Sequence, residues 1–198
     1  MKKKVLILAG IAVSITAIIS CSSTQNEKVA VAEISNDSLV KRGAYLVNMM
    51  GCNDCHTPKK MTPQGPALDM DRMLSGHPAE FPVLPFDTAT TRNWVLFNMV
   101  GTGTVGPWGA SFAANLTSDE TGIGSWTEEQ FKKALTEGKF KGLDGSRPLL
   151  PPMPWENYKD MKEDDIKAIF AFLKSTKPVK NVVPQAIAPQ DLRSVSKL

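Results

Sequence analysis

The stretch Cys52-Asn53-Asp54-Cys55-His56 has the pattern C-x-x-C-H, and the rest of the chain is best understood from it. This pattern is the attachment site of a c-type haem. Two thiols separated by two residues can each add to one haem vinyl group and become a thioether. The histidine that follows at once is placed under the iron as its proximal ligand. The sequence therefore predicts one covalently bound haem c, held by Cys52, Cys55 and His56.

Other uses of a cysteine pair need surroundings that this sequence does not provide. A structural zinc site needs four ligands and usually a second Cys or His pair. The only other cysteine and histidine are Cys21 and His77, which are far apart in the sequence. A thioredoxin-like redox pair needs an alternating strand–helix context, and a plain disulfide would leave His56 unexplained. Haem attachment is the favoured interpretation.

The N-terminus has the parts of an export signal. Lysines occupy positions 2–4, an apolar run covers residues 5–19, and Cys21 follows. We interpret residues 1–20 as a signal peptide that is removed on export. Its last residues resemble a bacterial lipobox, which predicts a lipid on Cys21. The alternative is an uncleaved anchor, although the run is short for a span. Both interpretations tether the domain to a membrane.

The charge of the chain changes once this signal is removed. The whole chain carries a net charge of +3, and residues 1–20 contain three lysines and no acid. The mature chain is therefore close to neutral. Nucleic-acid binding requires a clustered basic face, so we expect no nucleic-acid partner. We expect a lipoprotein on the periplasmic side, in either the inner or the outer membrane; export fits haem c, which is attached outside the cytoplasm.

Composition and pattern divide the mature chain into three parts. Residues 21–36 are predicted to be a lipidated N-terminus and flexible linker, which could reach roughly 50 Å when extended. Residues 37–184 are predicted to be the cytochrome c domain, and residues 185–198 a C-terminal tail that contains Pro189.

Periodic apolar residues predict three helices. The first is expected to be capped by Asp37 or Ser38 and to end at Gly51. The second is expected to begin with a capping box formed by Thr127 and Gln130 and to stop at Gly138. The third is expected to run from residue 163 to shortly before Pro178, with an acidic first turn. The apolar stripe of the first helix comprises Leu39, Gly43, Leu46, Val47 and Met50.

Residues 57–115 show no clear period and contain many prolines. Such a long irregular segment is unusual in a compact domain, but a buried haem would give it a surface to pack on. Residues 93–100 fit either a short helix or a strand. With little strand signal elsewhere, the sequence predicts an all-α domain in which three helices and long loops enclose one haem.

Met153 is the predicted second axial ligand of the iron. It lies between Pro152 and Pro154, and prolines on both sides stiffen the loop that would hold a weak thioether ligand. His77 is the rival ligand, although a lone histidine in a loop is more often bonded to its neighbours. The other methionines lack comparable support and fit packing roles better.

Several segments resemble one known family. Residues 115–126 (NLTSDETGIGSW) resemble a run in cytochrome c subunits of membrane-bound dehydrogenases that serve alcohol and gluconate oxidation. Residues 151–155 (PPMPW), residues 158–173 and residues 74–78 (LSGHP) look like segments of the same proteins. A glycine and an aromatic residue, Gly43 and Tyr45, before C-x-x-C-H resemble the first helix of class I cytochromes c. The resemblance covers about residues 38–184.

This resemblance implies a class I fold in which the first and last helices cross near Gly43, with Phe170 beside the contact. It also implies thioethers at Cys52 and Cys55, with His56 proximal and Met153 distal. Trp126 is a candidate haem contact, and it also stands at the staple position before the second helix.

The functional expectation is a tethered electron carrier rather than an enzyme. Its partners would be transient redox proteins, such as a dehydrogenase or a terminal oxidase. A first alternative is a fixed cytochrome subunit of one dehydrogenase complex; such subunits often carry several haem motifs, whereas this chain has one. A second is a haem enzyme or gas sensor with an open iron site.

Overall fold

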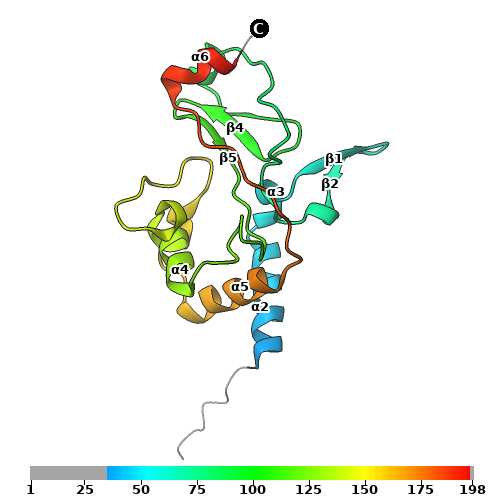
Figure 1. The fold of residues 1–198 in the computed structure, drawn as a ribbon, viewed down its shortest axis with the longest axis vertical. Coiled ribbons are helices and arrows are strands. Elements are labelled where there is room, and N and C mark those ends of the chain that lie inside the picture. The colour runs from blue at the N-terminus through cyan, green and yellow to red at the C-terminus, as the bar shows by residue number, and fades with distance from the viewer. Residues whose placement is uncertain (1–34, 197–198) are drawn as a thin grey trace, which may run out of the picture. The chain divides into compact units, whose positions relative to one another are not determined.

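The computed structural model describes residues 35–196, which form helices, two small antiparallel sheets and several single turns of 3-10 helix (Figure 1). The predicted signal peptide, Cys21 and nearly all of the linker lie outside the described residues. The helices are α2 (Asn36–Met49), α3 (Cys52–His56), α4 (Glu128–Glu137), α5 (Glu163–Ser175) and α6 (Leu192–Val195). The strands are β1 (Lys59–Thr62), β2 (Gly65–Leu68), β3 (Leu96–Phe97), β4 (Gly103–Gly106) and β5 (Gly109–Phe112).

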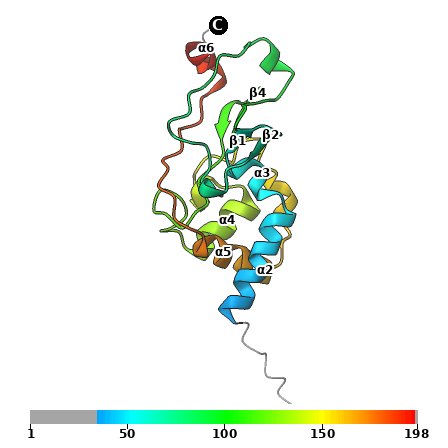
Figure 2. The same cartoon turned by 90° about the vertical axis from the view of Figure 1, so that its right-hand side faces the viewer.

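Helices α2 and α5 cross and form the most extensive contact between any two elements of residues 35–196 (Figure 2). Gly43 lies at the crossing, as expected, because a Cβ atom there would overlap the Ala168 carbonyl oxygen and lie 2.7 Å from Phe172 Cβ. The neighbours of Gly43 on α5 are therefore Ala168 and Phe172, and not Phe170 as predicted. Phe170 instead faces α4, with its ring centroid 5.5 Å from that of Phe131.

The helix ends follow the sequence signals in part. The capping box of Thr127 and Gln130 is present, and α4 stops at Gly138 in the left-handed conformation (φ 65°). Helix α2, however, begins earlier than predicted. Ser35 is its cap, because its hydroxyl accepts from the Ser38 backbone N–H at 3.3 Å. The prediction of Asp37 or Ser38 as cap was wrong because several capping residue types stand in a row there.

The segment between α3 and α4 contains the strands. β1 pairs with β2, and β3, β4 and β5 form a second sheet in that order, with all pairs antiparallel. Residues 93–100 thus contain a strand, which resolves the ambiguity of the sequence. The fold is helical with small sheets, so the expectation of an all-α domain is confirmed only in part. Strands of two to four residues are too short to show an alternating pattern.

After α5 the chain continues as an extended strap, residues 176–188, which runs from α5 toward the second sheet (Figures 1 and 2). Ile187 exchanges two backbone hydrogen bonds with Ala110 of β5, at 2.8 and 2.9 Å. The described part of the predicted tail continues into α6, where Leu192 is buried. The strap therefore connects the helices to the sheet.

The main apolar core lies between α2, α4 and α5. Partly buried side chains that pack against it include Cys52, Trp126 and Met153. Its fully or nearly buried members are Val47, Leu74, Ile123, Phe131, Leu135, Ile166, Ile169 and Leu173.

Candidate haem-binding site

The predicted attachment motif forms the single helical turn α3, directly after α2. Gly51 makes the junction in the left-handed conformation (φ 68°), which glycine adopts at little cost. In a helical turn, residues three apart lie on the same side. The turn therefore presents Cys52 and Cys55 on one side of α3 and ends at His56.

Both cysteines are free thiols in this structure and partly buried. Burial raises the pKa of Cys52 to about 11 and also raises the pKa of Cys55. A thiol–disulfide catalyst instead has a depressed pKa. Tyr158 lies near both thiols: burial raises the pKa of its hydroxyl, and the charges of the two cysteines raise it further.

The imidazole of His56 has a fixed orientation. Its Nδ1 lies 2.8 Å from the backbone carbonyl oxygen of Ala114. A carbonyl can only accept, so Nδ1 carries the proton and donates. Burial lowers the pKa of His56, which favours the neutral ring with its free lone pair on Nε2. A hydrogen-bond acceptor at the other ring nitrogen fixes the orientation of a metal-binding histidine and raises its basicity.

Backbone hydrogen bonds from Gly76 and His77 join α3 to the peptide next to the Ala114 carbonyl. The backbone N–H of Gly76 donates to the His56 carbonyl at 2.8 Å, and that of His77 donates to Ala113 at 2.9 Å. A Cβ at Gly76 would lie 2.5 Å from the Ala113 oxygen and 2.6 Å from the Ala114 oxygen. Residues 74–78, selected earlier only by resemblance, thus form the support of the predicted proximal ligand.

Thr57 joins the attachment turn to the same support. Its hydroxyl donates to Asn53 Oδ1 at 2.7 Å and accepts from the Leu74 backbone N–H at 2.8 Å. Thr57 is fully buried, and its bond with the Leu74 backbone is shielded from water. Sequence reasoning missed Thr57 and Ala114. Thr57 directly follows the motif, which is a usable signal, whereas a backbone carbonyl leaves none.

Met153 lies on the loop between α4 and α5 and packs against the same core as Cys52. The loop is tied to the second sheet by Ser111 on β5, whose hydroxyl donates to the Pro151 carbonyl at 2.6 Å. The same hydroxyl accepts from Trp108 Nε1 at 3.1 Å. The Met153 loop is therefore anchored from β5.

The other two candidates occupy different places. Trp126 is partly buried and packs against the core, where it also precedes the capping box of α4. The rival ligand His77 is buried between Phe81 and Phe112, and its Nδ1 lies 2.9 Å from the Thr102 hydroxyl. His77 is not among the side chains of the core that Cys52 and Met153 share.

The side chains present fit a covalent haem. Two thiols lie on one side of a helical turn, and the imidazole beside them has its Nδ1 occupied by Ala114 and its Nε2 free to bind a metal. A thioether packs on the same apolar core as the first thiol. Soft sulfur and imidazole nitrogen are the axial ligands that c-type haem iron takes. None of the helices within residues 35–196 has both the length and the apolar character that crossing a bilayer requires.

Comparison with known proteins also points to c-type cytochromes. No protein-family model matches the chain. It is 29% identical over 166 residues to the cytochrome c subunit of an alcohol dehydrogenase (quinone) from Gluconobacter oxydans. The aligned segment covers 82% of this chain and 27% of that protein. It is 30% identical over 158 residues to a gluconate 2-dehydrogenase cytochrome c subunit from Pantoea cypripedii. This alignment covers 79% of this chain and 26% of that protein.

A third relative is the fructose dehydrogenase cytochrome subunit of Gluconobacter japonicus, 36% identical over 85 residues, or 42% of this chain and 17% of that protein. The chain thus spans about a quarter or less of the length of these relatives. Together they support a cytochrome c-like family.

Proposed function

We propose that this protein is an electron-transfer cytochrome that carries one haem c and cycles a single electron between redox partners. The observation that carries this proposal is the motif turn itself. Cys52 and Cys55 share one side of α3, and His56 beside them has its Nδ1 engaged by Ala114 and its Nε2 available. The three relatives described above are cytochrome subunits, which agrees with it.

Each residue has a separate task in this proposal. Cys52 and Cys55 hold the haem through thioethers, so the cofactor cannot dissociate. His56 would bind the iron through Nε2, and Met153 would supply the second protein ligand through its thioether sulfur. When bound, the haem supplies the one-electron couple between ferric and ferrous iron. The apolar core around Cys52 and Met153 keeps water away from the ligands, which helps to set the potential.

We assign the partner by the names of the relatives. They are subunits of alcohol, gluconate and fructose dehydrogenases, so a dehydrogenase is the proposed electron donor. A free carrier would meet it through a small, transient interface, whereas a fixed subunit would stay with it. Purification from the native membrane separates the two: a dehydrogenase that co-purifies at constant ratio supports the fixed subunit, and a monomeric protein supports the carrier.

We also propose that a lipid on Cys21 tethers the protein to the membrane, facing the periplasm. The support is the sequence of residues 1–21. In the full chain, Cys21→Ala should block lipidation and signal cleavage at this site. Mass spectrometry of the wild-type protein should find a diacylated Cys21 as the first residue. An unmodified Cys21 within a longer chain would contradict the tether.

The direct test of the haem assignment is its stoichiometry and attachment. The protein is produced with a c-type haem maturation system, and haem is assayed by the pyridine haemochrome spectrum and by mass. We expect one haem per chain that resists acid–acetone extraction. Cys52→Ala combined with Cys55→Ala should abolish covalent attachment. Haem that is extractable from the wild type, or attached to the double variant, would contradict the proposal.

A further inference from the structure

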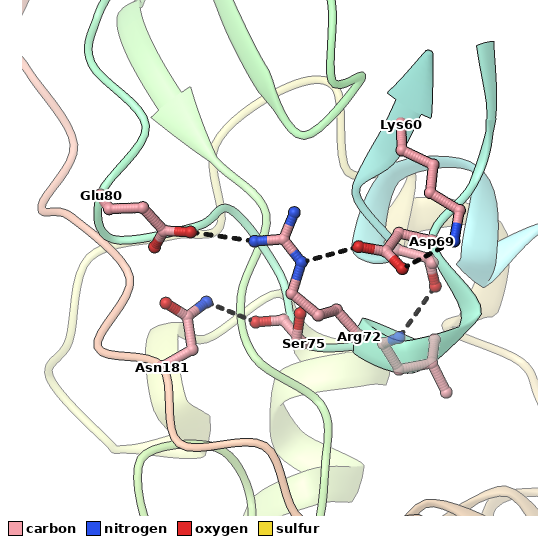
Figure 3. Close-up of polar contacts among 8 residues, drawn as sticks. Lys60, Asp69, Arg72, Ser75, Glu80 and Asn181 are labelled. Atoms are coloured by element: carbon pink, nitrogen blue, oxygen red, sulfur yellow. Dashed lines mark hydrogen bonds and ion pairs between the residues drawn. The ribbon is translucent and has the colours of Figure 1, made fainter. Parts of the chain in front are cut away.

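The strap that follows α5 contains a buried asparagine, Asn181, whose side chain bonds three backbone groups of one distant segment. Its Nδ2 donates to the carbonyl of Ser75 at 2.7 Å and to that of His77 at 2.9 Å. Its Oδ1 accepts from the Ala79 N–H at 2.9 Å. Figure 3 shows the amide pointing at Ser75 across the space between the two segments.

The segment that Asn181 holds is the support of the predicted proximal ligand. Ser75 and His77 flank Gly76, whose N–H donates to the His56 carbonyl at 2.8 Å. The His77 N–H donates to the carbonyl of Ala113, next to the Ala114 carbonyl that accepts from His56 Nδ1. The Asn181 side chain therefore bonds the backbone on both sides of Gly76, the residue that donates to the His56 carbonyl.

Residues 74–78 pack too closely against the Ala113–Ala114 peptide to move independently of the Ala114 carbonyl, which accepts the His56 hydrogen bond. The Cα of Gly76 faces the Ala113–Ala114 peptide with no room for a methyl group. A neighbouring asparagine strengthens the link, since Asn115 Nδ2 donates to the Val179 carbonyl of the same strap at 2.8 Å. A shift of the strap would thus be transmitted to the Ala114 carbonyl from two directions.

We propose that Asn181 is a positioning residue for the proximal haem ligand, because it fixes the carbonyl that accepts the His56 Nδ1–H hydrogen bond. This inference rests on the proposed function, in which His56 binds the iron. A strong Nδ1–H bond makes the imidazole a better donor to iron and stabilises the ferric state. Asn181, on the strap after the last long helix, would therefore lower the reduction potential without touching the haem.

The test is Asn181→Ala in the haem-loaded protein, compared with wild type by redox titration. Loosening the acceptor should weaken the His56 bond and favour the ferrous state. We expect the ferrous-to-ferric ratio at a fixed ambient potential to rise about threefold, which is roughly 28 mV at ~59 mV per tenfold for one electron. In NMR spectra, exchange of the His56 Nδ1–H with water should be faster by about threefold or more.

The matched control is Ser118→Ala. Its hydroxyl donates to the Thr176 carbonyl at 2.6 Å, so the variant removes a strap contact that does not reach residues 75–79. It should leave the potential and the exchange rate of the His56 proton unchanged, whatever it does to stability. If Asn181→Ala does not fold, Asn181→Ser keeps a hydroxyl that can bond one of the three groups and is measured in the same way.

The outcomes separate this inference from the proposed function. A wild type without a His56-ligated haem overturns both. A normal wild type in which the Asn181 variants match Ser118→Ala in potential and proton exchange overturns the positioning role alone. A potential that rises in the Asn181 variants, together with faster exchange of the His56 proton, supports it.

Discussion

At the scale of single residues, the site depends on which atoms of His56 are already used. The Ala114 carbonyl occupies Nδ1, so Nε2 is the only ring nitrogen left for a metal. The Met153 side chain has no hydrogen-bond partner among residues 35–196, and its position depends on the proline-flanked loop and on packing against the core. The two proposed axial ligands are thus held by different means, a hydrogen bond and a loop.

We predict that Met153→Ala opens one axial position of the iron. A missing thioether should lower the reduction potential, because methionine raises it. The ferrous form should then bind carbon monoxide readily, as followed by optical spectroscopy. Met61→Ala is the control, since the Met61 side chain is 65% exposed and lies on the β1 hairpin. A spectrum that Met153→Ala leaves unchanged would show that another residue is the distal ligand.

At the scale of elements, the α2–α5 crossing depends on the missing side chain of Gly43. Alanine is intrinsically better than glycine in a helix by about 1 kcal/mol. At this position, however, its methyl group would overlap the Ala168 carbonyl of α5. Packing therefore outweighs helix propensity at the crossing.

We predict that Gly43→Ala lowers the free energy of unfolding by about 1–3 kcal/mol, the usual cost of overpacking. Denaturation with guanidinium, followed by tryptophan fluorescence, measures it. Asn48→Ala on the exposed face of α2 is the control, because it changes propensity without a clash. A Gly43→Ala protein as stable as wild type, or more stable, would mean that the helices are not in contact there.

A second element-scale prediction concerns the anchor of the Met153 loop. Ser111→Ala removes the hydroxyl that donates to the Pro151 carbonyl. Loss of a hydrogen bond worth about 1 kcal/mol should raise the population of the detached loop by about fivefold. Stopped-flow binding of carbon monoxide to the ferrous protein should accelerate accordingly. Ser175→Ala, which removes a similar bond to Phe172 at the end of α5, should have no effect on this rate.

How much the sequence predicted differs between elements. The capping box of α4 was predicted correctly, because it depends on residue types at a fixed local spacing. The contact at Gly43 was also predicted correctly, from the resemblance to class I cytochromes c. A strand was one of two alternatives for residues 93–100, and the other strands were missed because they are too short to show an alternating pattern. Among the site residues, the motif is visible in sequence, but the roles of Thr57 and Asn181 are not. The position of Thr57 directly after the motif is a signal in the sequence, but its bond to the Leu74 backbone, 17 positions away, is not. The bond from Asn181 to the Ser75 carbonyl joins residues 106 positions apart, which no local pattern reports.

At the scale of the whole described molecule, charges tie the first hairpin to the support of His56. Arg72 donates to Asp69 at 2.9 Å and to Glu80 at 3.0 Å, and Lys60 lies 3.5 Å from Asp69 (Figure 3). Burial would raise the pKa of Asp69, but hydrogen bonds and charges from Arg72 and Lys60 outweigh it, so the pKa lies below its usual 3.8. These ion pairs join Lys60 and Asp69 of the hairpin region to Arg72 and Glu80, which lie on either side of residues 74–78.

We predict a small acid-dependent loss of stability from this network. A carboxyl with a depressed folded pKa stabilises the fold above its unfolded pKa of 3.8, and this contribution is lost as the pH falls through the lower folded value. Asp69→Asn should therefore cost about 1 kcal/mol or less at pH 7, with a smaller difference from wild type at pH 3. Denaturant titrations at both pH values measure it.

Asp71→Asn is the control for that comparison, because Asp71 is exposed and forms no ion pair within residues 35–196. It should match wild type at both pH values. An Asp69→Asn deficit that grows toward pH 3 would contradict the assigned direction of the pKa shift.

The most direct test of the account is the optical spectrum of the purified haem protein, ferric and ferrous, with carbon monoxide added to the ferrous form. We predict a low-spin spectrum, a weak near-infrared band from methionine bound to ferric iron, and no ready binding of carbon monoxide. That result would establish ligation by His56 and a methionine, as an electron carrier requires. A high-spin spectrum, or ready binding of carbon monoxide, would contradict it and indicate an open iron site suited to catalysis or gas sensing.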